Sequence, residues 1–216
     1  MYDLVILTTA CSRSKLHTHV LSEIPEFLKG YKCKWIIRID QINNESVNDT
    51  ISNFKKILNA EHIDLEIYSS DRTAGRISWF KSVKFCINKG FEYKPKLGYF
   101  WLEDDWKKKN NNNLKTILDP LINNITNNSF YISLANRNIL NFNPCIWSYD
   151  LYEQYMYNKI NNEIMPENGG NAERACTYKS GNPEPVDNIN IYTQNIFVDE
   201  GRAWADINIK GARTFN

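Results

Sequence analysis

The chain has 216 residues, a length typical of one domain with a sizeable hydrophobic core. Hydrophobic residues make up 42% and charged residues 24%, which is ordinary for a globular protein and excludes a disordered chain or a membrane protein. A formal net charge of +1 excludes nucleic acid and anionic membranes as partners held by a global field, so any phosphate must be bound locally.

Short β-branched runs alternate with amphipathic stretches over residues 1–135. Hydrophobic residues at helical spacing predict helices, and the β-branched runs predict strands. The strands are expected over residues 4–8, 35–39, 65–68, 99–102 and 130–134, and the helices over 16–28, 47–58, 77–87 and 114–125. This alternation is typical of an α/β fold, here a single Rossmann-like domain with a mainly parallel central sheet and helices on both faces.

Glycine and proline residues indicate where the helices end. Gly30 and Gly90 predict the C-termini of the first and third helices, while Pro120 predicts a kink or a restart within the fourth. The polar run 107–113 predicts a solvated loop. Beyond about residue 136 the regular alternation ends, and further glycines and prolines indicate irregular connections.

Neither the cysteines nor the first residues indicate secretion. The five cysteines lie far apart and form no C-x-x-C pair and no Cys/His cluster, which favours a reducing compartment and argues against a zinc site. The start lacks a basic segment, and the apolar run 4–7 is too short for the core of a signal peptide or for a membrane span. We therefore expect a cytoplasmic protein without a membrane span.

Three consecutive acids, Glu103, Asp104 and Asp105, follow the fourth predicted strand. Carboxylates packed together repel one another and lose solvation, so a divalent cation is the partner that best accommodates them. A solvated turn leading into the lysines 107–109 is the alternative interpretation. Ligands of an open α/β sheet bind beyond the carboxyl ends of its strands, and the acids occupy such a position.

Small or polar residues follow the other predicted strands as well. The first strand ends in Thr8-Thr9 with Arg13 close behind, the second ends at Asp40, and Arg76 follows the third. Taken in order with the acidic triplet, these segments resemble the family 2-like glycosyltransferases of GT-A fold. That family has a Thr-Thr-Tyr-Asn-Arg-like end of the first strand, an acid after the second, and an Asp-x-Asp motif at the end of a later hydrophobic strand.

Three later segments extend the resemblance. Residues 143–147 are similar to the acceptor-side strand of the family, and residues 171–174 lie where the family carries its catalytic base. Residues 197–204 resemble the segment that completes the metal and diphosphate site. Two features depart from the family pattern: the first acid of the motif is Glu103, and no histidine occurs late in the chain, so Asp199 would have to act as a ligand instead.

The resemblance implies a metal-dependent glycosyltransferase of the hexosyltransferase type. Its donor would be a nucleotide sugar, with a UDP-sugar as the first choice, and its acceptor the hydroxyl of a glycan or another molecule. Inversion at the anomeric carbon and Mn²⁺ or Mg²⁺ as cofactor are also implied. Within a single domain of residues 1–216, residues 1–106 would bind the nucleotide sugar and residues 107–216 the acceptor.

The resemblance also assigns roles to individual residues. Asp105 and Asp199 would bind the metal, and Glu173, with Glu167 as second choice, would be the general base that takes the proton of the acceptor hydroxyl. Donor contacts are expected from Thr8, Thr9, Arg13, Asp40, Arg76, Glu103, Asp104 and Arg202.

Each of these assignments has a structural alternative. Asp40 is also the kind of residue that caps a helix or closes a turn, and Glu173 could be a solvated charge on a helix. Arg13 and Arg76 could be surface arginines, and Arg202 could stack on Trp204. His17 and His19, two residues apart, do not share a helix face and are expected to be exposed to solvent.

Two other functions remain open. A nucleotide- or carbohydrate-binding module without catalysis is compatible with the departures from the family pattern. A sugar-phosphate nucleotidyltransferase would share the fold class and the acidic metal site, but no Gly-rich loop with a basic residue follows the first strand.

Overall fold

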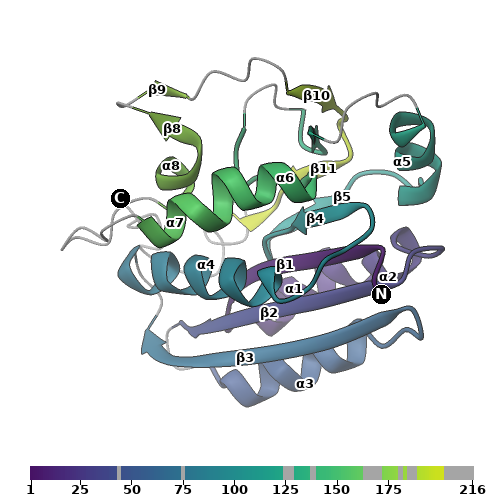
Figure 1. Cartoon of the computed structure of the whole chain (residues 1–216). Helices are drawn as coiled ribbons and strands as arrows, with labels where there is room; N and C mark the ends of the chain where they lie inside the picture. Colours follow the sequence, from purple (N-terminus) through teal and green to yellow (C-terminus); the bar gives the residue numbers. More distant parts are fainter. Residues whose placement is uncertain are drawn as a thin grey trace.

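The computed structural model of the protein describes residues 1–42, 45–73, 76–123, 129–136, 140–162, 172–179, 182–183 and 189–201. A seven-stranded sheet lies at its centre (Figure 1). The strands of this sheet are β1 (Leu4–Cys11), β2 (Cys33–Gln41), β3 (Ile63–Thr73), β4 (Gly98–Trp101), β6 (Phe130–Ser133), β7 (Cys145–Trp147) and β10 (Asn190–Thr193). Their order is β10-β6-β7-β4-β1-β2-β3. Among these described strands β7 alone runs antiparallel to its neighbours, which confirms the predicted, mainly parallel α/β sheet.

Helices cover both faces of the sheet, as the sequence predicts (Figure 1). One face is covered by α1 (Ser14–Leu21), α2 (Ile24–Phe27), α3 (Val47–Ile57) and α5 (Leu114–Ile122). The other is covered by α4 (Arg76–Phe91), α6 (Tyr149–Leu151), the π-helical segment η1 (Tyr152–Asn158), α7 (Lys159–Asn162) and α8 (Ala172–Thr177). Because successive side chains of a strand point to opposite faces, β1 contributes Leu4 and Ile6 to one core and Val5 and Leu7 to the other.

The first predicted helix differs from the structure. The single helix expected over residues 16–28 is divided into α1 and α2, and Pro25 lies in the first turn of α2, where its missing N–H is tolerated. Pro120 lies inside α5, which continues to Ile122 without a restart. Helix α4 ends at Phe91, next to the stop predicted at Gly90. This glycine also allows close packing of α4 on η1, because a Cβ there would lie 2.7 Å from the hydroxyl oxygen of Tyr152.

The polar run 107–113 is not a loop throughout, which corrects the prediction. Its first residues belong to β5 (Trp106–Lys108), which pairs antiparallel with β11 (Phe197–Asp199) in a separate two-stranded sheet. Trp106 and Lys108 are buried while Lys107 between them is partly exposed, the alternation of a strand with one covered face. A further short hairpin joins β8 (Tyr178–Lys179) and β9 (Asn182–Pro183).

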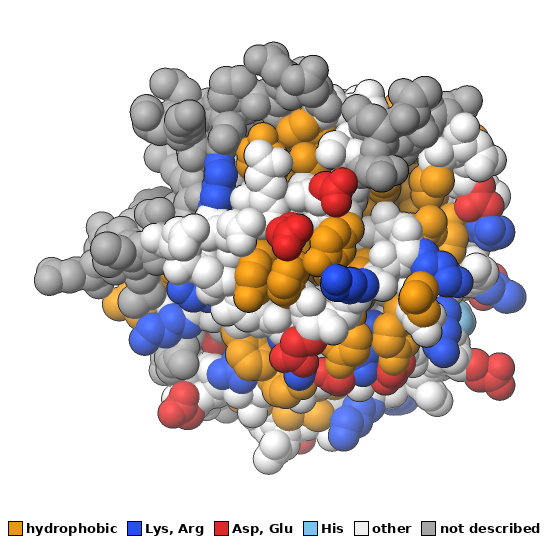
Figure 2. All heavy atoms as spheres, viewed as in Figure 1, with side chains coloured by type: hydrophobic (Ala, Val, Ile, Leu, Met, Phe, Trp, Pro, Cys, Tyr) orange, Lys and Arg blue, Asp and Glu red, His pale blue; other side chains and the backbone are white. Residues whose placement is uncertain are grey.

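The face of the molecule in Figure 2 carries basic and acidic side chains intermixed with hydrophobic ones, without a broad field of one sign among the residues shown in colour. This distribution agrees with a net charge close to zero. None of the helices that the structure describes has the length and apolar character needed to cross a bilayer.

Candidate active site

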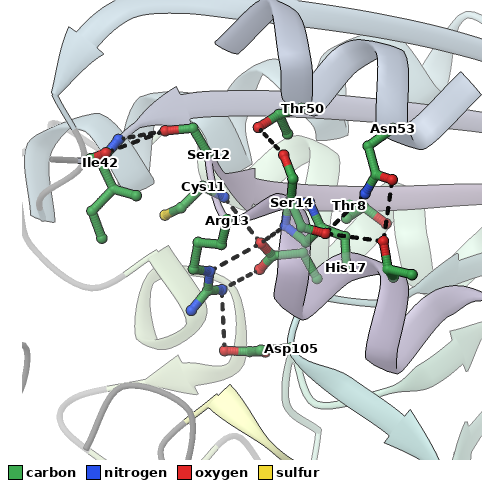
Figure 3. Close-up of polar contacts among 12 residues, drawn as sticks. Thr8, Cys11, Ser12, Arg13, Ser14, His17, Ile42, Thr50, Asn53 and Asp105 are labelled. Carbon is green, nitrogen blue, oxygen red and sulfur yellow. Dashed lines mark hydrogen bonds and ion pairs between the residues drawn. The ribbon is translucent and has the colours of Figure 1, made fainter. Parts of the chain in front are cut away.

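The acidic triplet lies at the carboxyl end of β4, beside the end of β1. Figure 3 shows its third member, Asp105, next to Arg13. Asp104 is buried there and bound by β1 and α1. Its Oδ2 accepts hydrogen bonds from the backbone N–H of Cys11 at 3.0 Å and from Nε2 of His17 at 2.7 Å. Its Oδ1 lies 2.6 Å from Nη2 of Arg13. Parallel pairing of β1 with β4 therefore brings Arg13 and the triplet together, as the shared sheet edge predicts.

His17 is fully buried, so the expectation that it is exposed to solvent is wrong. Its ring stacks on Phe54 of α3 with centroids 4.4 Å apart, and its Nε2 points to Asp104. A buried carboxylate needs hydrogen-bond donors, and α1 provides one on its inner face. His19, in contrast, is exposed, and its Nε2 lies 3.2 Å from the Nζ of Lys107.

The three acids of the triplet differ in their pKa values. Burial works to raise the pKa of Asp104, but the charge of Arg13 and the hydrogen bond from His17 hold it well below its usual range. Burial raises the pKa of Asp105 to about 6, because the charge of Arg13 offsets burial only in part and Asp104 adds repulsion. The pKa of Glu103 is raised well above its usual range by burial and by the nearby carboxylates. Asp104 is thus compensated within the protein, whereas Arg13 compensates Asp105 and Glu103 only in part.

Asp199 lies next to Asp105 at the end of β11 and contributes to the raised pKa of Asp105. The backbone after β11 packs closely on this carboxylate: a Cβ on Gly201 would lie 2.2 Å from Oδ2 of Asp105. The N–H of Glu200 donates to the backbone oxygen of Asp105 at 2.9 Å, and the N–H of Gly201 donates to Oδ1 of Asp199 at 3.0 Å. The structure thus brings together the two carboxylates expected to bind a metal.

The donor set of Asp105 and Asp199 fits a divalent cation of the Mg²⁺ or Mn²⁺ type. The part of the chain that the structure describes holds no group of three or more His, Cys, Asp or Glu side chains arranged to bind a metal. Such a cation is commonly bound by one or two carboxylates together with the phosphates of a substrate. Two neighbouring carboxylates at the edge of a parallel sheet, those of Asp105 and Asp199, satisfy that requirement.

Thr8 and Asp40 use their polar atoms within the protein. The hydroxyl of Thr8 donates to the backbone oxygen of Leu102 and accepts from Nε1 of Trp35 at 2.9 Å. Asp40 accepts hydrogen bonds from the hydroxyls of Ser70 and Ser82. Both side chains are buried, and they fix the ends of β1 and β2 against their neighbours.

Glu173 reaches the same region from α8. Its Oε1 accepts a hydrogen bond of 3.0 Å from the backbone N–H of Phe142, whose ring packs on Trp101 at the end of β4. The charge of Glu173 is one of the causes of the raised pKa of Glu103, which places the two carboxyl groups near each other. The candidate base therefore lies at the same edge of the sheet as the acidic triplet.

The remaining predicted residues fall in two groups. Thr9 is nearly buried in β1, and Arg76 begins α4, with its side chain outside the described part of the structure. Glu167 and Arg202 lie outside the described residues. The sequence interpretation missed the role of His17, although Arg13 and His17 are four residues apart, the spacing that places two side chains on one helix face.

Neither a protein-family model nor a curated protein sequence matches the chain. Among solved structures, the crystal structure of S. aureus TarS has a TM-score of 0.57 at 9% sequence identity, covering 90% of this chain and 36% of TarS. The apo structure of the bifunctional glycosyltransferase WbbM has a TM-score of 0.37 at 9% identity, covering 95% of this chain and 32% of WbbM, too low to establish a shared fold. The chain thus spans about a third of each. The likeness to TarS shows that this chain and the matched part of TarS share a fold.

Proposed function

We propose that the chain is a metal-dependent glycosyltransferase of the hexosyltransferase type, which transfers a sugar from a nucleotide-sugar donor, in the first instance a UDP-sugar, to an acceptor hydroxyl with inversion. The observation that carries this proposal is the convergence of Asp105 and Asp199 at the carboxyl edge of the sheet, with the pKa of Asp105 raised to about 6. The glycosyltransferase fold supports sugar transfer in general.

The charge balance at this edge favours a cation and a diphosphate. Burial and mutual repulsion destabilise the ionised forms of Asp105 and Glu103, and a divalent cation would relieve both effects. Asp105 and Asp199 would hold Mn²⁺ or Mg²⁺. When bound, the cation supplies Lewis-acid stabilisation of the negative charge that develops on the leaving diphosphate.

Arginines would add to that stabilisation. The guanidinium of Arg13 lies 3.5 Å from Oδ2 of Asp105, beside the position proposed for the cation. Its fixed place in the free protein means that no reorganisation is required when charge develops on the diphosphate. Arg76 and Arg202 remain the further candidates for diphosphate contacts, and Thr9 for the nucleotide.

Glu173 is the proposed general base. In the transfer step the acceptor oxygen forms a bond to the anomeric carbon while the bond from that carbon to the phosphate oxygen breaks. The bonding electrons leave with the nucleoside diphosphate, and the hydroxyl proton passes to the carboxylate of Glu173. The hydrogen bond from Phe142 to Oε1 orients this carboxylate. Because Glu173 would take the proton of the acceptor, the acceptor is expected to bind on the α8 side of the acidic triplet.

Release of UDP from a panel of UDP-sugars, with Mn²⁺ or with a chelator, tests the proposal. We expect slow release from at least one donor with Mn²⁺, faster release when the right acceptor is present, and no release with the chelator. Asp105→Asn should abolish release, while Glu66→Gln, at the opposite end of the sheet, should not change it. Binding of UDP without release from any donor would instead identify a binding module.

A further inference from the structure

The carboxylate of Asp104 is saturated by donors from its own chain. It receives the backbone N–H of Cys11, Nε2 of His17, and both Nε and Nη2 of Arg13, at 3.0, 2.7, 3.4 and 2.6 Å. Only 3% of the residue is exposed. A carboxylate offers about four lone-pair positions, so four donors leave little capacity for a ribose hydroxyl or a cation.

His17 fixes the orientation of that carboxylate. Because an ionised carboxylate only accepts hydrogen bonds, the Nε2 atom of His17 carries the proton in this contact. The ring is held in place by its stacking on Phe54. Its Nδ1 has no hydrogen-bond partner among the described residues, so the polar contact that the structure shows for this imidazole is the one with Asp104.

Arg13 is shared unequally between two acids. Its Nη2 lies 2.6 Å from Oδ1 of Asp104 and 3.5 Å from Oδ2 of Asp105. The backbone next to it is anchored, because the N–H of Ser12 donates to the backbone oxygen of Asp40 at 3.0 Å. A guanidinium and a carboxylate can form a close two-pronged pair, and Asp105 would be the partner of Arg13 if Asp104 did not bind it first.

We propose that Asp104, oriented by His17, is a positioning residue that takes the close contact with Arg13, limits its contact with Asp105 to the longer one of 3.5 Å, and so keeps the Asp105 carboxylate available for a cation. Asp104 itself touches neither the cation nor the donor. The benefit to cation binding rests on the proposed function, but the pairing of Arg13 with Asp104 can be tested in the free protein. It gives the middle acid of the triplet a role different from that of the third.

The first experiment uses the metal-free protein and therefore does not depend on the proposed function. The Nε–H resonance of Arg13 is assigned in a ¹⁵N spectrum by its absence from Arg13→Gln. We expect it to exchange slowly with solvent in the parent and in Asp105→Asn, and to move and exchange rapidly in Asp104→Asn. A resonance that responds to Asp105→Asn as strongly as to Asp104→Asn would overturn the inference.

The second experiment separates a positioning role from a ligand role by a double substitution. In calorimetric titrations with Mn²⁺ alone, Asp104→Asn should weaken binding about tenfold, since loss of a charge-assisted contact lets Arg13 pair more closely with Asp105. If Arg13 is the cause, Asp104→Asn combined with Arg13→Gln should recover Mn²⁺ affinity measured without UDP. A double variant as weak as Asp104→Asn would show that Asp104 is itself a ligand.

Failure of this inference can be distinguished from failure of the proposed function. If the parent binds neither Mn²⁺ nor UDP, the proposed function is wrong, and the arginine spectrum still decides the inference. Near-ultraviolet circular dichroism establishes that each variant is folded. His17→Gln, which keeps an N–H donor, should preserve the slow exchange of the Arg13 Nε–H better than His17→Leu, and equal effects of the two would contradict the role of His17.

Discussion

Two groups of charged and polar residues lie at opposite ends of the parallel strands and differ in how their charges are compensated. The amino-end cluster comprises Tyr2, Lys34, Asp64, Glu66, Tyr68 and Tyr93. The carboxyl-end cluster comprises Arg13, His17, Glu103, Asp104, Asp105, Glu173 and Asp199.

In the amino-end cluster the acids are matched by donors. Nζ of Lys34 lies 2.7 Å from Glu66 and 3.1 Å from Asp64, and the hydroxyl of Tyr93 donates to Glu66 at 2.7 Å. Burial works to raise the pKa of Glu66, but the hydrogen bonds from Lys34, Tyr93 and Tyr68 lower it to about 2. The cluster ties β2 to β3 and offers no uncompensated charge to a ligand.

In the carboxyl-end cluster one acid is fully compensated and its neighbours only in part. The pKa of Asp104 is lowered, whereas that of Asp105 is raised to about 6 and that of Glu103 is raised well above its usual range. Groups held in an unfavourable ionised state are typical of sites that await a ligand, while fully paired groups are typical of structural clusters. We therefore propose that the carboxyl-end cluster binds a ligand and that the amino-end cluster stabilises the fold.

The largest effect is expected from Glu173→Gln. Glutamine keeps the shape and can still accept the hydrogen bond from Phe142, but it cannot take the acceptor proton, so the transfer rate should fall by about 10²–10⁴-fold. Binding of UDP with Mn²⁺ should stay near the parent value. Glu167→Gln is the matched control, and a loss of transfer in that variant with retention in Glu173→Gln would move the base to Glu167.

Asp105→Asn should affect binding and stability in opposite directions. Loss of the proposed cation ligand should weaken Mn²⁺-dependent UDP binding by about 100-fold, the equivalent of about 3 kcal/mol. At pH 7 the free energy of unfolding should rise by about 1–3 kcal/mol, because the parent carries there a largely buried charge that Arg13 compensates only in part.

The direction of the stability change in Asp105→Asn follows from the raised pKa of Asp105. Between about pH 4 and 6 the native carboxyl binds protons more tightly than the unfolded one, so this group makes the parent less stable as the pH rises. The stability difference between Asp105→Asn and the parent should therefore be absent below pH 4 and grow up to pH 6. Denaturant unfolding at a series of pH values measures it, and a variant less stable than the parent at pH 7 would contradict the assignment.

Glu66→Gln should have the smallest effect, and on stability alone. The lowered pKa of Glu66 means that its ionised form stabilises the native state above about pH 4.5, and substitution should cost about 2 kcal/mol at pH 7. As the pH falls towards 2, the parent loses this contribution and the two proteins should converge. UDP affinity should not change. A variant with parent stability but weakened UDP binding would reverse the roles of the two clusters.

Local patterns in the sequence were sufficient to predict five of the seven strands and the place of the acids, whereas β7 was expected only from the family resemblance and β10 was missed. The β-branched runs of β1 and β2, and the rule that ligands bind at the carboxyl ends of parallel strands, directed attention to Asp105. They could not show that β5 pairs with β11, because this contact joins distant segments, one of them predicted as a loop. Before the structure, only the family resemblance led us to expect that Asp105 and Asp199 lie close together.

The differences within the triplet were beyond sequence reasoning. Asp104 and Asp105 are adjacent and chemically identical, and only their surroundings distinguish them. His17 and the shorter contact of Arg13 bind Asp104, whereas the backbone after Asp199 packs on Asp105. The amino-end cluster was missed for the same reason, since the charges of β2 and β3 become neighbours only through the register of the two strands.

The most direct test of the central claim is a calorimetric titration of the parent protein with UDP, once in Mn²⁺ and once in a chelator. The account predicts that UDP binds with Mn²⁺ and that binding is lost on chelation, because the diphosphate and the carboxylates of Asp105 and Asp199 would otherwise repel each other. Equal affinity in the two titrations would contradict it, since the carboxyl-end cluster would then bind no metal.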